Sequence, residues 1–169
     1  MFHSLSKLTW LLAISIVLSA SFMRQLLELT VTIIPKSYVS LGIWIVLFCA
    51  PLSLVFFIRK NTPRFQDYLL PAAYILIGIL LAILLELPEE RVHIIKYGLL
   101  GFLTAKDFYS SRYNSLRYPI IFCLAVGITD ELFQSLLPYR VGDVRDVFFD
   151  SLSATLGALF YGSVNKSLP

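Results

Sequence analysis

The chain has 169 residues, of which 57% are apolar and only 15% are charged, and its mean hydropathy is +0.77. This composition excludes an ordinary water-soluble domain and predicts an integral membrane protein. The net charge of +3 comes without a basic stripe of interleaved aromatic residues, so we also expect no binding to nucleic acid.

Six apolar segments can be marked along the chain, and a spanning helix needs about 20 residues. They cover approximately residues 8–23, 37–58, 68–85, 92–105, 118–137 and 147–164. No Gly/Ser-rich or Pro-rich linker divides them. We therefore predict an all-α protein: a single membrane domain over residues 1–169 that forms a polytopic transmembrane helical bundle of about five to six spans.

Two of these segments allow a second interpretation. The first resembles a signal-peptide core, with Lys7 ahead of it and Leu18-Ser19-Ala20 as a weak cleavage site, but we expect it to stay as a span. The fourth has a short apolar core and could be interfacial or tilted. Its helix could begin earlier, at Pro88, because proline favours the first position of a helix.

Basic residues in the connections predict the orientation, because loops rich in Lys and Arg tend to stay in the cytoplasm. With a cytoplasmic amino terminus and six spans, the inner connections hold Lys7, Arg59, Lys60, Arg64, Lys106, Arg112, Arg117 and Lys166, and the outer ones hold Arg24, Lys36, Arg91, Arg140 and Arg145. The excess inside predicts that both termini are cytoplasmic. It also places the turn from Glu86 to Arg91 and the turn from Arg140 to Asp146 at the outer face.

Polar residues recur at helical spacing on the last three segments. The three stripes are Glu86, Glu89, His93, Lys96 and Tyr97; then Asp130, Glu131 and Gln134; then Asp143, Asp146, Asp150, Ser153 and Gly157. A charged side chain costs about 2.5 to 3.5 kcal/mol at the bilayer centre on insertion scales, so these acids must be paired or solvated. The small residues Ala154, Gly157 and Ala158 predict close approach of a neighbouring helix.

Two interpretations of the acids stay open. In the first, Arg140 and Arg145 neutralise Asp143, Asp146 or Glu131 and tie two spans together. In the second, a further ligand is present, because five acids and two arginines from Asp130 to Asp150 leave three formal negative charges to be met. His93, Lys96, protons, water or a cation could meet them, and Lys96 could instead extend outward to the interface.

A metal site is chemically conceivable on the last stripe. Asp143, Asp146 and Asp150 share one helical face, and carboxylate oxygens suit Mg²⁺, Mn²⁺ or Ca²⁺. The pattern is superficially similar to that of membrane CDP-alcohol phosphotransferases, but the longer signature of that family is missing. The sequence also contains no His-Glu-x-x-His motif, no Gly-rich phosphate loop and no Gly-x-Ser-x-Gly elbow. We therefore expect no cofactor and assign no metal ligand.

Taken together, these residues resemble the VanZ-like family of small bacterial membrane proteins over roughly residues 80–165. The resemblance rests on His93, Tyr97, the run Gly-Leu-Leu-Gly-Phe-Leu at 98–103, Asp130-Glu131-x-x-Gln134, Pro138, Arg140, Asp143, Asp146, Asp150 and Gly157. The chain departs from the family pattern at two places. Glu90-Arg91 replaces the familiar Asp-Lys pair, and Asp150 stands where Asn is usual.

The resemblance implies a multi-pass protein of the bacterial cytoplasmic (inner) membrane with a role at the cell envelope. Members of the family are linked to low-level resistance to the glycopeptide teicoplanin, although many occur without any resistance cluster. We expect an outward-facing polar site formed by His93, Lys96, Tyr97, Glu131, Gln134, Arg140, Asp143, Asp146 and Asp150.

Two functions fit such a site. The favoured one is binding of a membrane lipid head group or a lipid-linked envelope component, with arginines taking phosphate oxygens. The alternative is a membrane enzyme that acts on a lipid-linked envelope substrate, with Glu131 as general base near His93. The sequence identifies neither the ligand nor the oligomeric state.

Overall fold

The computed structural model of the protein describes residues 5–58, 66–85, 87–109, 116–140 and 142–165. Within these ranges the chain is all-α, as predicted, with seven helices and no strand. The helices are α1 (Lys7–Ser19), α2 (Met23–Ile33), α3 (Lys36–Ile58), α4 (Gln66–Leu84), α5 (Pro88–Tyr109), α6 (Arg117–Ser135) and α7 (Val144–Asn165). Six of them correspond to the six apolar segments, and Pro88 does open α5.

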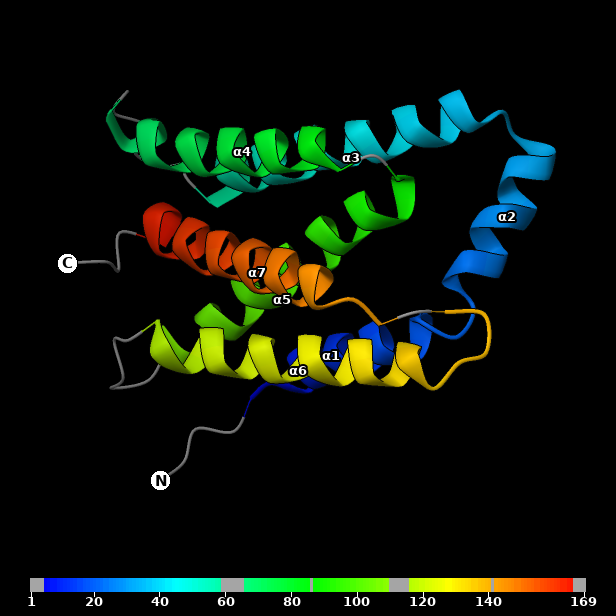
Figure 1. Ribbon diagram of the computed structural model, residues 1–169. Coiled ribbons are helices and arrows are strands. Elements are labelled where there is room, and N and C mark those ends of the chain that lie inside the picture. Colours follow the sequence, from blue (N-terminus) through cyan, green and yellow to red (C-terminus); the bar gives the residue numbers. More distant parts are fainter. Residues whose placement is uncertain (1–4, 59–65, 86, 110–115, 141, 166–169) are drawn as a thin grey trace.

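The pair α5 and α7 forms the centre of the bundle (Figure 1). Helices α1 and α6 pack on one side of this pair, and α3 and α4 pack on the other. Apart from α2, successive helices alternate in direction, so α1 begins and α7 ends at the same end of the bundle. Helices α5 and α7 both begin at the opposite end, where Glu90 of α5 lies near Arg145 of α7.

Helix α2 was not expected from the sequence, which placed these residues in a connection. Its 11 residues follow α1 after a bend of 72°, and the helix lies across the end of the bundle (Figure 1). Arg24 and Glu28 form an ion pair on it at 3.1 Å, whereas Leu26, Leu29 and Ile33 are exposed. A short helix with separate apolar and polar faces is typical of segments that lie along a membrane surface.

The number of spans was predicted too high. Among the described residues, α3, α4 and α7 are long and apolar enough to cross a membrane, and α1 with α2 would make a fourth if the bent pair counts as one span. Helix α1 alone has 13 residues, fewer than the roughly 20 that a span needs. Helices α5 and α6 are long enough but are not apolar enough to count as spans, and two of the acids that lower the hydropathy of α6, Asp130 and Glu131, belong to the site described below.

Helices α5 and α7 approach each other through their small residues, as predicted. A Cβ atom on Gly101 would overlap the carbonyl oxygen of Ala154, and one on Gly157 would overlap the carbonyl oxygen of Gly98. Ala154 and Ala158 are both buried in the same contact region. This close packing fixes α7 against α5 and so determines which of their polar side chains can meet.

Candidate functional site

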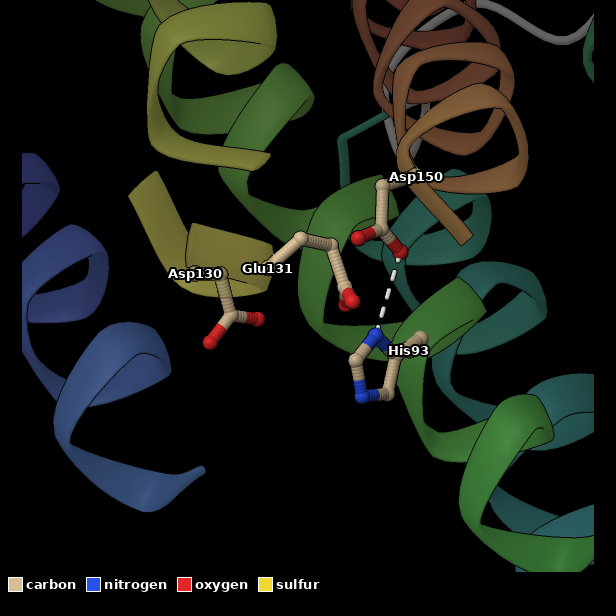
Figure 2. Close-up of side chains that lie close together, drawn as sticks. All are labelled: His93, Asp130, Glu131 and Asp150. Atoms are coloured by element: carbon tan, nitrogen blue, oxygen red, sulfur yellow. Dashed lines mark hydrogen bonds and ion pairs between the residues drawn. The ribbon is translucent and has the colours of Figure 1, made fainter. Parts of the chain in front are cut away.

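Four side chains from three helices converge at the end of the bundle where α5 and α7 begin. His93 comes from α5, Asp130 and Glu131 come from α6, and Asp150 comes from α7. One nitrogen or oxygen atom from each lies within 4.8 Å of the others. Figure 2 shows the four side chains pointing toward a common space. All three acids are buried, so water cannot solvate their charges freely.

Two hydrogen bonds connect this four-residue cluster across the helices. His93 Nδ1 lies 3.2 Å from Asp150 Oδ1 (Figure 2), and the hydroxyl of Tyr97 donates to Asp130 Oδ2 at 3.0 Å. Tyr97 is fully buried, and its ring stacks on that of His93 with centroids 6.0 Å apart. Helix α5 therefore holds both a carboxylate of α6 and a carboxylate of α7.

Glu131 has a different environment, because it organises the loop between α6 and α7. Its Oε1 accepts a hydrogen bond from Gln134 Nε2 at 2.8 Å, and its Oε2 accepts one from the backbone N–H of Asp143 at 2.9 Å. The side-chain oxygen of Gln134 accepts from Arg140 through both Nε and Nη2. The chain of contacts therefore runs from the buried carboxylate of Glu131 through a neutral amide to the half-buried guanidinium of Arg140.

The arginines do not neutralise the acids that the ion-pair interpretation assigned to them. Arg140 bonds to the Gln134 amide, and the Arg145 guanidinium lies 3.8 Å from Glu90 on α5. In the described part of the chain, neither guanidinium lies within ion-pair distance of Glu131, Asp143 or Asp146. The interpretation in which these arginines neutralise the acids therefore has no support among the described residues, where no arginine pairs with the buried acids.

In a comparison with protein-family models, residues 89–165 match the VanZ/LLP1 family. Over these residues the chain is similar to the VanZ-like family, as the sequence predicted. The match contains α6, α7 and nearly all of α5, together with all four residues of the cluster. With the apolar helices, it fits a membrane protein of this family. Comparisons with curated proteins and with solved structures gave no match.

One contact to the site comes from outside the VanZ-like region. No described carboxylate lies within ion-pair distance of Lys96, although Asp130 and Asp150 are close enough to interact with it electrostatically; its Nζ donates to Ser19 Oγ at the end of α1, 3.2 Å away. From the sequence, Ser19 was assigned no role except in a weak cleavage site, because a lone serine in an apolar run carries no signal for such a contact. Ala13 and Ile16 of α1 pack against Tyr97 in the same core, so α1 is part of the bundle.

The other predicted site residues on α7 and its preceding loop, and two further charged residues near α5, lie outside the four-residue cluster. Asp143 is exposed and accepts a hydrogen bond from the backbone N–H of Arg145 at 2.8 Å, and Asp146 is half-buried in the first turn of α7. Arg91 turns away from the site, because its guanidinium donates to the carbonyls of Ala82 and Leu85. Glu86 lies outside the described residues.

Asp130 was noted in the polar stripe of α6 but was not included in the predicted site. It is nevertheless fully buried and belongs to the four-residue cluster. The signal that could have identified it is its position beside Glu131, within the same arc of the helix.

An apolar cavity of about 230 Å³ lies elsewhere, between α3, α4, α5 and α7. Its lining includes Pro51, Tyr74, Ile94 and Phe102, and none of the four cluster residues. The cavity is thus not the entrance to the polar site. Of the four cluster residues, His93 has the most exposed side chain, at 15%.

Proposed function

We propose that the polar end of the bundle binds the anionic head group of a membrane lipid or a lipid-linked envelope component. In this proposal the protein lies in the bacterial inner membrane with both termini in the cytoplasm and the site facing outward. The observation that carries the proposal is the set of groups that the Arg140 guanidinium contacts. Its guanidinium is held by a neutral amide, and none of the described carboxylates lies within ion-pair distance of it.

A positioned guanidinium without an acidic partner is suited to phosphate oxygens. Arginine binds phosphate through two parallel N–H donors, and such charge-assisted hydrogen bonds are stronger than neutral ones. Gln134, itself held by Glu131, fixes the Arg140 side chain before any ligand arrives. Binding would then cost less side-chain entropy than it does for a free surface arginine.

The position of α2 supports a ligand in the lipid head-group region. Arg24 at the start of α2 donates from Nη1 to the backbone carbonyl of Tyr139, 3.2 Å away. The hydroxyl of Tyr139 in turn donates to the carbonyl of Ser21 at 2.6 Å. These bonds tie the loop that carries Arg140 to the junction of α1 and α2. If the exposed leucines of α2 enter the membrane surface, Arg140 lies at the depth of the phosphates.

The test compares Arg140→Gln with Arg145→Gln, which removes the same charge from the same loop region. We expect Arg140→Gln to weaken binding of phosphatidylglycerol and of a polyprenyl phosphate by about 10- to 100-fold, the value of a hydrogen bond to a charged group. Native mass spectrometry of the full chain in detergent would measure both affinities. Arg145 is 52% exposed and already faces Glu90, so its variant should change binding less than threefold.

Two results would contradict the proposal. One is an equal loss of affinity in the two variants, which would indicate general attraction by positive charge. The other is equal affinity for diacylglycerol, which has no phosphate, and for phosphatidylglycerol.

The enzyme alternative is favoured by one observation, the pair formed by His93 and Asp150. A carboxylate that orients an imidazole is a common acid–base unit. Glu131, which the sequence suggested as general base, has both oxygens engaged by Gln134 and Asp143, so His93 is the better candidate. If the chain hydrolyses a polyprenyl-diphosphate-linked sugar, His93→Gln should lower turnover at least 100-fold while head-group binding persists. Absence of turnover by the unaltered protein would eliminate this alternative.

A further inference from the structure

We propose that His93, Asp130, Glu131 and Asp150 bind a divalent transition-metal ion. One ligand-capable atom from each lies within 4.8 Å of the others (Figure 2). Ligands at about 2.0 to 2.6 Å from a common ion can be at most about 4 to 5 Å apart, so the cluster already has the dimensions of a first coordination shell. The site differs from the Asp143, Asp146 and Asp150 stripe that the sequence suggested for a cation.

Two carboxylate oxygens in the cluster are buried and accept no hydrogen bond from the described residues. They are Asp130 Oδ1 and Asp150 Oδ2, on side chains that are 0% and 1% exposed. Buried polar atoms in folded proteins are almost always paired, and an exception calls for an explanation such as a bound ion or water. Because these oxygens come from two different helices and belong to side chains that point into one space, a single ion could satisfy both (Figure 2).

The charges around the cluster lead to the same conclusion. Three carboxylates carry three formal negative charges, and neither Arg140 nor Arg145 pairs with them. Lys96, which interacts electrostatically with Asp130 and Asp150, offsets one charge and leaves two. A divalent cation supplies those two charges. Without such compensation, several buried carboxylates would repel one another at close range.

The donor set indicates which cations to expect. Mg²⁺ and Ca²⁺ prefer shells made wholly of oxygen, whereas an imidazole together with carboxylates suits Mn²⁺, Fe²⁺ or Zn²⁺. His93 is also the most exposed of the four residues, which gives the ion a route to the buried oxygens. The inferred ligand is therefore a first-row transition-metal ion, independent of any lipid.

The experiment titrates the full chain in detergent, stripped with a chelator, with Mn²⁺ alone. Electron paramagnetic resonance of the free ion gives the number of bound ions and the Kd. We expect one Mn²⁺ per chain, displaced by Zn²⁺ but not by a 100-fold excess of Mg²⁺. Asp150→Asn should weaken binding at least tenfold, and Asp130→Asn should do the same if Asp150→Asn fails to fold by circular dichroism.

Asp143→Asn is the matched control, because it makes the same change just before α7 and lies outside the cluster. Asn can replace Asp as a cap at the start of a helix, so this variant should keep its fold and bind Mn²⁺ within twofold of the unaltered chain. Absence of saturable binding, equal weakening by Asp143→Asn and Asp150→Asn, or displacement by Mg²⁺ would each overturn the inference. None of these outcomes bears on Arg140, so head-group binding stands or falls separately.

Discussion

Gly101→Ala should destabilise the folded protein by about 3 kcal/mol, the upper part of the range for overpacking a tightly filled contact. The added methyl group would occupy the position of the Ala154 backbone carbonyl on α7. A backbone carbonyl held in a helix cannot rotate away as a flexible side chain can. Helices α5 and α7 would have to move apart. This would disrupt the core contact that includes Tyr97, Leu100 and Ala154. Unfolding in detergent and increasing SDS, followed by circular dichroism, would measure the loss.

Gly98→Ala is the matched control for this prediction. It makes the same change one turn earlier on the same helix, where a Cβ would meet the carbonyl oxygen of Ser153 at an ordinary 3.8 Å. Alanine also favours a helix by about 0.5 to 1 kcal/mol over glycine, so this variant should be neutral or slightly stabilised. Equal stability of the two variants would show that α5 and α7 do not approach closely at Gly101.

The positions of the helices could be predicted because long apolar runs identify them directly. The short helix α2 could not, because its residues lack a sufficiently long apolar run, and only its packing at the end of the bundle reveals its direction. The span count failed for a related reason. Counting segments treats every apolar helix as lipid-facing, whereas α5 and α6 direct polar side chains such as His93, Tyr97 and Asp130 toward one another and toward α7.

The candidate site could be predicted as a set of helix faces but not as a set of contacts. Periodicity placed His93, Glu131 and Asp150 on polar stripes, and the structure brings all three together. Periodicity could not predict which partner each side chain contacts, because that depends on the rotation and depth of one helix relative to another. Arg140 bonds to Gln134 of the neighbouring helix end, and Arg91 turns to the end of α4.

Glu131→Ala should cost about 2 to 4 kcal/mol of stability, because it leaves two donors without their acceptor. The Gln134 amide, which is buried, and the backbone N–H of Asp143, which is partly buried, both donate to this carboxylate, and a buried donor that loses its partner costs about 1 to 3 kcal/mol. Loss of the Gln134 contact would also release Arg140. Chemical unfolding in detergent should therefore show a lower free energy of unfolding, accompanied by weaker head-group binding.

Glu131→Gln separates this structural role from the negative charge. The amide keeps one oxygen for either Gln134 or Asp143, so stability should fall by less than half as much as in Glu131→Ala. Glu28→Ala is the control at an exposed position. In the described structure Glu28 pairs only with Arg24, within α2, and such surface pairs contribute about 0.5 kcal/mol or less to stability. If Glu131→Ala proves as mild as Glu28→Ala, the loop that carries Arg140 is held by other contacts, and its fixed orientation can no longer support head-group binding.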